Sequence, residues 1–235
     1  MCDIWLEQPK EFGDVVNINR ATNVKLENLK IIGSRVPGSN VQTHTHGIFF
    51  QTLGSIYVPQ NITIQGCEIS NIGHAIYVDE PVRNIRINSS EIHDCWTGIS
   101  LGVEAISNGP SMIKIAHNHF YEIDSYGINC NSSLPGVTSV GNTFFNVGII
   151  DTTAPIVFGP SAVGCTSIAD QVYPVTGNLV VENHNLGYNL VIGSQQNNMP
   201  MPVPDLYGPI TLFDNNPIVP APSGLSFNPV LTNTI

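Results

Sequence analysis

Two glutamates occupy the same position in two neighbouring repeats of the sequence. Glu68 and Glu91 each stand directly before an isoleucine, 23 residues apart. If the repeats stack, the two carboxylates become neighbours, and such a pair can act as acid and base on a glycosidic bond. Neighbouring like charges also repel each other, and a solvated polar ladder fits the same pattern. The sequence leaves both interpretations open.

A histidine extends this set. His93 lies two residues beyond Glu91 and precedes Asp94, an order that suits a general base held by a carboxylate. The candidate catalytic residues are therefore Glu68, Glu91 and His93. Outward positions of the aligned repeats also carry charged groups, imidazoles and aromatic rings, which suit sugars, although rings also pack between subunits. The candidate carbohydrate-binding residues are Arg86, Glu91, His93, His119, Tyr121 and Tyr77.

A metal site has weaker support. Alternate residues of a strand face the same way, so His44 and His46 are weak candidates for metal ligands. The neighbouring sequence offers no third ligand, and the five cysteines form no CxxC pair. A loop with two polar histidines is the simpler interpretation, and we expect no metal and no cofactor.

An internal repeat predicts the elements that position these residues. Each nine-residue segment alternates apolar and polar residues in two short stretches, one on either side of a two-residue turn. One more short strand follows each segment. The segments are Asn23–Ile31, Asn61–Ile69, Asn84–Ile92 and Met112–Phe120, and the strands that follow them are Gly47–Phe50, Ala75–Val78, Gly98–Leu101 and Gly127–Cys130. Three short strands per repeat of 23 to 29 residues predict stacked coils, because each strand is too short to form a sheet alone.

Stacked coils would bury continuous columns of apolar side chains. Four inward columns are expected: Ile62, Ile85 and Ile113; Ile64, Ile87 and Ile115; Ile69, Ile92 and Phe120; and Ile76, Ile99 and Ile128. Cys67, Cys95 and Cys130 also fall inward without stacking on another cysteine, so we expect free core thiols. The sequence therefore predicts an all-β fold, a right-handed parallel β-helix in the form of a single-stranded solenoid, with an irregular Pro-rich C-terminal extension.

The repeat pattern Asn-Ile-x-Ile-x-x-(Cys/Ser/Asn)-x-Ile, followed by Gly-Ile, resembles that of the pectate-lyase-like superfamily of right-handed parallel β-helices. It is most similar to the β-helix segments of phage tail fibre and tailspike proteins. The resemblance covers about residues 14–150 and implies the fold, whereas function varies widely within the superfamily. The calcium-binding carboxylates of pectate lyases are missing, because the matching positions hold Lys25, Arg86 and Lys114 beside the single carboxylate of Glu27. The motifs of polygalacturonase-type hydrolases are missing as well.

The repeats also suggest the domain organisation. We expect the β-helix over residues 1–193, clearly over 14–150 and less certainly over 151–193. Residues 194–235 hold eight of the 17 prolines and are expected to be an extended tail, packed on the β-helix or on a neighbouring subunit. No Lys or Arg follows Lys114, and the net charge is −10, so partners such as nucleic acid or an anionic membrane are not expected. No apolar run is long enough to span a membrane.

The leading functional hypothesis is a structural, receptor-contacting β-helix segment of a phage tail fibre, tailspike or similar virion appendage that contacts cell-surface polysaccharide. A homotrimer is expected, because an apolar, Pro-rich C-terminal tail fits chains that wrap one another. Synthesis in the host cytoplasm is expected, because the N-terminus lacks a signal-peptide pattern. The alternative is a polysaccharide-degrading hydrolase or lyase that acts in the outer groove of the β-helix, in an extracellular setting. The sequence does not decide whether the protein is an enzyme, and the missing motifs favour a non-catalytic role.

Overall fold

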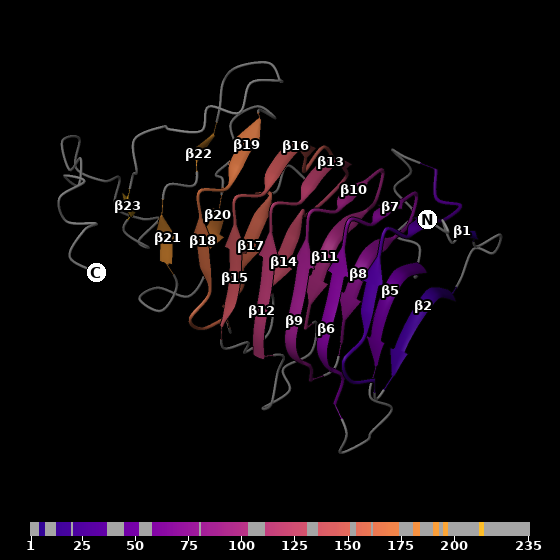
Figure 1. Cartoon of the computed structure of the whole chain (residues 1–235). Coiled ribbons are helices and arrows are strands. Elements are labelled where there is room, and N and C mark those ends of the chain that lie inside the picture. The colour runs from indigo at the N-terminus through magenta and orange to yellow at the C-terminus, as the bar shows by residue number, and fades with distance from the viewer. Residues whose placement is uncertain are drawn as a thin grey trace.

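The computed structural model describes residues 5–7, 13–19, 21–36, 45–51, 58–79, 81–102, 111–130, 136–150, 154–160, 162–173, 181–183, 190–192, 195–196 and 212–213. In these residues the chain forms strands and turns and no helix. The strands stack along one direction, from indigo β2 at one end to orange β21 and β22 at the other (Figure 1). No helix that could cross a membrane occurs in this part of the chain.

The strands form three sheets, A, B and C. Sheet A has the order β1 (Trp5–Glu7), β4 (Lys30–Ile32), β7 (Glu68–Ser70), β10 (Glu91–His93), β13 (His119–Ile123), β16 (Thr143–Val147), β19 (Gln171–Tyr173) and β22 (Gln195–Gln196). Sheet B has β2 (Gly13–Asn19), β5 (Thr45–Gln51), β8 (His74–Val78), β11 (Thr97–Leu101), β14 (Ile128–Cys130), β17 (Ile156–Phe158) and β20 (Val181–Asn183). Sheet C has β23 (Leu212–Phe213), β21 (Leu190–Ile192), β18 (Thr166–Ile168), β15 (Val137–Val140), β12 (Ser111–Ala116), β9 (Arg83–Asn88), β6 (Gln60–Gln65) and β3 (Lys25–Glu27).

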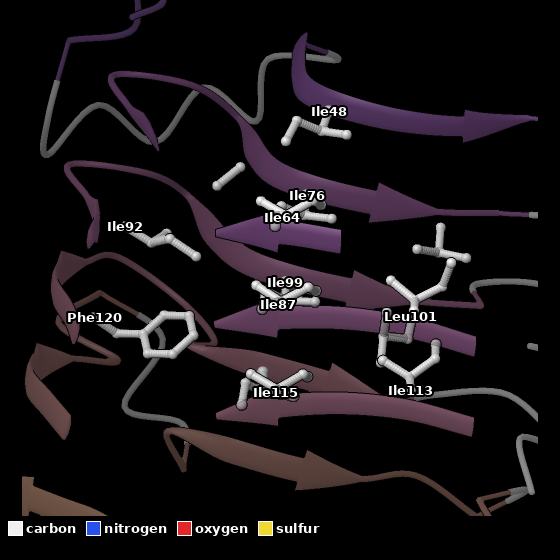
Figure 2. Close-up of a cluster of buried hydrophobic side chains, with 14 of the residues drawn as sticks. Ile48, Ile64, Ile76, Ile87, Ile92, Ile99, Leu101, Ile113, Ile115 and Phe120 are labelled. Atoms are coloured by element: carbon white, nitrogen blue, oxygen red, sulfur yellow. The ribbon is translucent and has the colours of Figure 1, made fainter. Parts of the chain in front are cut away.

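Each coil passes through sheets C, A and B in turn, as β6, β7 and β8 do. Each strand from β1 to β22 pairs in parallel with the strand at the same place in a neighbouring coil, so the predicted parallel β-helix is confirmed. The register also confirms the four inward columns: Ile62, Ile85 and Ile113 are successive partners, as are Ile76, Ile99 and Ile128. Residues of these columns are at most 1% exposed. Figure 2 shows the inward side chains in successive rows of this core, with Ile64 and Ile76 in one row and Ile87 and Ile99 in the next.

The corners between sheets need a backbone shape that most residues avoid. Positive φ angles recur at matching places in successive coils, because a tight corner requires the left-handed region. At the entry to sheet C these residues are Asn23, Asn61, Asn84 and Met112; between sheets C and A they are Asn28, Gly66, Ser89, His117, Gly141 and Ala169; after sheet A they are Asn71, Asp94, Glu122 and Asn146. Asparagine and glycine dominate, as their tolerance of this region predicts.

A ladder of buried amide side chains lines the corner between sheets C and A. The Asn118 backbone N–H donates to Asn142 Oδ1 (2.9 Å), and the Asn142 N–H donates to Asp170 Oδ1 (2.8 Å). The ladder begins one coil earlier, where the Cys67 N–H donates to Ser90 Oγ (3.1 Å), and the Ser90 N–H in turn donates to Asn118 Oδ1 (3.0 Å). Strands cannot satisfy these corner N–H groups, so buried side chains do so instead. The ladder therefore holds the spacing between the coils that carry β10, β13, β16 and β19.

Cys67, Cys95 and Cys130 are buried free thiols, as predicted. Burial raises the pKa of the Cys95 thiol to about 12. Cys165, whose place the sequence did not indicate, is also buried, and a hydrogen bond links its thiol to that of Cys130. The structure thus adds a thiol–thiol contact that the inward pattern did not predict.

The parallel sheets continue past residue 150 through β17, β18, β19, β20 and β21. The short strand β22 lies beyond residue 193 and pairs with β19. Of the Pro-rich tail, β23 is also described, and it pairs antiparallel with β21. The rest of residues 194–235 lies outside the described part of the chain.

Candidate functional site on the outward face of sheet A

Two columns of outward side chains run side by side along sheet A. The polar column, defined by the pairing register, consists of Lys30, Glu68, Glu91, His119, Thr143 and Gln171. The ring column consists of Ile32, Ser70, His93, Tyr121, Phe145 and Tyr173, of which Ser70 and Tyr173 are buried. Successive members lie about one strand spacing, about 4.8 Å, apart. The face therefore presents the charged side chains of Lys30, Glu68 and Glu91 beside the rings of His93, Tyr121 and Phe145.

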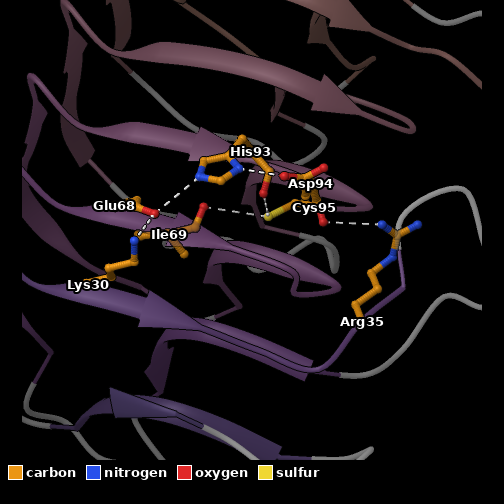
Figure 3. A network of polar contacts seen from close by, with 7 residues as sticks. All are labelled: Lys30, Arg35, Glu68, Ile69, His93, Asp94 and Cys95. Carbon is orange, nitrogen blue, oxygen red and sulfur yellow. Dashed lines mark hydrogen bonds and ion pairs between the residues drawn. The ribbon is translucent and has the colours of Figure 1, made fainter. Parts of the chain in front are cut away.

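Glu68 and Glu91 are direct partners on adjacent strands, as the sequence predicted. Their repulsion is offset on one side, because Lys30 Nζ lies 2.7 Å from Glu68 Oε1. His93 Nε2 lies 3.6 Å from the same Glu68 oxygen, and His93 Nδ1 lies 2.6 Å from Asp94 Oδ2. Figure 3 shows this connected line of side chains, which crosses three coils. The imidazole is therefore held between two carboxylates.

Tyr121 lies flat against His93. Their ring centroids are 4.5 Å apart and the planes differ by 5°, while His119 approaches Tyr121 at 5.1 Å. Phe145 and Tyr173 continue the ring column into the next two coils. Sequence reasoning did not include these two residues, although each follows an inward residue of a weaker repeat, which is the signal that identifies them.

The face is electronegative. The pKa of the Tyr121 phenol is raised to about 12 by partial burial and then by Glu91, Glu68 and Asp94. The hydroxyl therefore stays protonated and can donate a hydrogen bond at any physiological pH. Burial also lowers the pKa of His119, and its buried Nε2 has no hydrogen-bond partner among the residues that the structure describes.

A buried ion pair supports the corner beneath this face. Arg35 and Asp124 pair through Nη2 and Oδ2, with 1% and 4% of their side chains exposed. Arg35 Nη1 also donates to the Asp94 carbonyl (3.4 Å), and the guanidinium lies 5.8 Å from the centre of the Trp96 ring. Figure 3 shows Arg35 reaching toward Asp94 from the side opposite Glu68 and Lys30. Arg35 thus fixes the corner that carries Asp94, a role that sequence reasoning missed because no repeat position indicates it.

The structure divides the predicted site residues among three faces. The catalytic candidates Glu68, Glu91 and His93 lie together on sheet A, joined by His119 and Tyr121. Arg86 lies on β9 in sheet C, and Tyr77 lies on β8 in sheet B. The six predicted carbohydrate-binding residues therefore do not form one surface.

Tyr77 belongs to a separate ring cluster on sheet B. Its ring lies 4.6 Å from that of His46 and 5.1 Å from that of His74, and Phe49 lies 4.8 Å from His46. The weak metal candidate His46 therefore packs among rings, while His44 lies outside the described residues. No group of three or more possible metal ligands occurs in the described part of the chain.

The register of the three sheets defines the chain as a parallel β-helix protein, with one strand per sheet in each coil. Similar solved structures include the surface adhesin PfbA of Streptococcus pneumoniae, at 14% identity and a TM-score of 0.44, over 74% of this chain and 43% of that chain. They also include the Dettilon tailspike protein, at 14% identity and a TM-score of 0.38, over 80% of this chain and 57% of that chain. The chain thus spans about half the length of these two proteins. No protein-family model and no curated protein matches the sequence.

Proposed function

We propose that the chain is a receptor-contacting β-helix of a phage tail fibre, tailspike or similar virion appendage, and that the outward face of sheet A contacts a cell-surface glycan. The observation that carries the proposal is the ring pair of His93 and Tyr121 beside the carboxylates of Glu68 and Glu91. Sugars combine an apolar face with hydroxyl edges. An aromatic plane suits the face, and carboxylates accept hydrogen bonds from the hydroxyls.

The geometry suits a polymer more than a single sugar. The ring column continues from His93 through Tyr121 to Phe145, so successive coils offer similar contacts along one axis. A glycan chain laid along this axis would meet a ring in each of these coils. Because each weak contact is repeated on one rigid support, avidity would build without a deep pocket.

Binding of bacterial surface polysaccharides to the whole chain tests the proposal. We expect Tyr121→Ala to weaken binding about fivefold or more, since stacking of a ring is worth about 1 kcal/mol or more. Tyr77→Ala is the matched control, because Tyr77 is also a half-buried tyrosine with ring partners, but on sheet B. If Tyr77→Ala abolishes binding and Tyr121→Ala does not, the sheet A proposal is wrong.

A second candidate function, a polysaccharide-degrading enzyme, is favoured by one observation. His93 is held by Asp94 at 2.6 Å and faces Glu68, as a general base with an orienting carboxylate would. The test is the release of new reducing ends from the same polysaccharides. Activity that is lost in Glu91→Gln or His93→Gln would support this candidate, whereas activity that survives both substitutions would remove the site from consideration.

A further inference from the structure

We propose that Cys130 and Cys165 form a modification site, a buried dithiol that a small peroxide converts to a disulfide between two neighbouring coils. Cys130 is the last residue of β14, and Cys165 directly precedes β18. Each cysteine therefore lies where the chain passes from sheet B to sheet C, and the two corners are one coil apart. This site lies in the core and does not depend on the glycan contact proposed for sheet A.

The two thiols are already in contact. A hydrogen bond links their sulfur atoms, and neither cysteine has exposed surface. The backbone is paired on both sides of the corner, because β14 pairs with β17 and β15 pairs with β18. A disulfide requires two side chains that are close and point toward each other. Paired strands and a thiol–thiol contact meet this requirement without a rearrangement of the coils.

Cys165 is the more reactive of the described thiols. The thiolate is the form that attacks an oxidant. The hydrogen bond with Cys130 lowers the pKa of Cys165, whereas burial raises the pKa of Cys67 and raises that of Cys95 to about 12. Cys67 and Cys95 also donate to backbone carbonyl groups, so they have no second thiol with which to react. Oxidation should therefore select the pair.

The reaction needs one peroxide molecule for each pair of thiols. The Cys165 thiolate attacks a peroxide oxygen, the O–O bond breaks, and the released hydroxide takes up the thiol proton and leaves as water. The Cys130 sulfur then attacks the sulfenic acid on Cys165, the S–S bond forms, and the S–O bond breaks. The oxygen leaves with the Cys130 proton as a second water. Two thiols are thereby oxidised and one hydrogen peroxide is reduced to two molecules of water.

The disulfide would fasten coils that short strands hold together. The strands β14, β17 and β18 have three residues each, whereas β5 and β8 of sheet B have seven and five. Shorter strands form fewer hydrogen bonds between coils, so a covalent link contributes most at this corner. Under the proposed appendage function the chain passes from a reducing cytoplasm to an oxidising exterior, and the link would form after the coils had folded.

The test treats the whole folded chain with a low concentration of hydrogen peroxide and maps disulfides by mass spectrometry of an unreduced chymotryptic digest. We expect one link, between Cys130 and Cys165 of the same chain, and a fall from five to three in the thiols that titrate after denaturation. The melting temperature should rise by about 5 °C or more, because the closed loop restricts the unfolded chain. A reductant should reverse both changes.

Variants separate the pair from the other core thiols. Cys165→Ala should abolish the link and the rise in melting temperature, whereas Cys95→Ala, which also removes a fully buried thiol, should leave both unchanged. The wild-type map decides even where a variant does not fold. Five thiols that remain after treatment of a folded chain would overturn the proposal, as would a link to Cys2, Cys67 or Cys95, or a link between two chains.

Discussion

Arg35 and Asp124 are charged residues with almost no exposed side-chain surface. They lie at equivalent corners after sheet A, and the guanidinium reaches past the coil of Asp94 and Trp96 to meet the carboxylate. A buried charge is costly unless it is paired, so each residue depends on the other. The corner that presents Asp94 to His93 therefore rests on this pair.

Breaking this pair from one side should destabilise the fold strongly. We expect Arg35→Met or Asp124→Leu to lower the free energy of unfolding by about 3–5 kcal/mol, because each leaves an uncompensated buried charge. The double variant should lose less than the sum of the two single losses. Urea unfolding followed by circular dichroism measures all three, and single losses below about 1 kcal/mol would contradict the assignment.

At the scale of elements, the amide ladder joins the corners between sheets C and A. Among the described residues, the ladder runs through Asn118 and Asn142 and reaches Asp170. The Asp170 carboxylate accepts hydrogen bonds from Asn142 and from Ser167 Oγ, the latter at 2.6 Å. Burial raises the pKa of the Asp170 carboxyl above its ordinary value, since burial outweighs the hydrogen bonds that favour the charged form. The ladder thus contains a group whose charge opposes folding.

The raised pKa of Asp170 predicts how the free energy of unfolding depends on pH. A carboxyl with a raised pKa in the folded state stabilises the fold fully below its ordinary pKa, and that contribution is lost as the pH rises through the raised pKa. Asp170→Asn keeps the acceptor for Asn142 and carries no charge. We therefore expect the variant to be more stable than the wild type at neutral pH, with a difference that shrinks toward acidic pH. Thermal unfolding from pH 3 to pH 8 measures this, and a difference that grows toward acidic pH would contradict it.

At the scale of the whole molecule, β21 is the last parallel strand of sheet C among the described residues. There β23 pairs antiparallel with β21, so the tail supplies a strand at this edge. Unpaired edges of parallel sheets promote association between chains. β23 therefore covers the edge of sheet C at β21.

Two truncations test this role of the tail. Deletion of residues 204–235 removes β23 and should cause concentration-dependent aggregation, whereas deletion of residues 216–235 keeps β23 and should not. Light scattering during incubation compares the two. Equal scattering from both truncated chains would show that β23 does not protect the edge.

The proposed appendage role also predicts an assembly. The ring column is an apolar stripe on sheet A, and three chains that pack side by side would bury it. We therefore expect the homotrimer that the sequence suggested. Light scattering coupled to size exclusion should give three times the chain mass. A stable monomer would contradict the appendage proposal and leave the glycan contact to be judged by Tyr121→Ala alone.

The sequence by itself determined the coil. Isoleucines that recur at one place in each repeat must be buried together, and only stacked strands bury them, so the inward columns and the partnership of Glu68 with Glu91 could be read directly. Many corners were readable too, because asparagine and glycine mark left-handed backbone, but Met112, Glu122 and Ala169 take the same conformation without such a mark.

The tertiary structure alone decided which outward residues share a face. Arg86 and Glu91 are five residues apart, yet a corner separates them onto sheets C and A, so they do not share a face. Arg35 with Asp124 and Cys130 with Cys165 meet across coils of different length, which no fixed period predicts. A repeat fixes what is buried, because burial follows the period; it does not fix contacts made across corners, because those depend on how far each corner turns the chain.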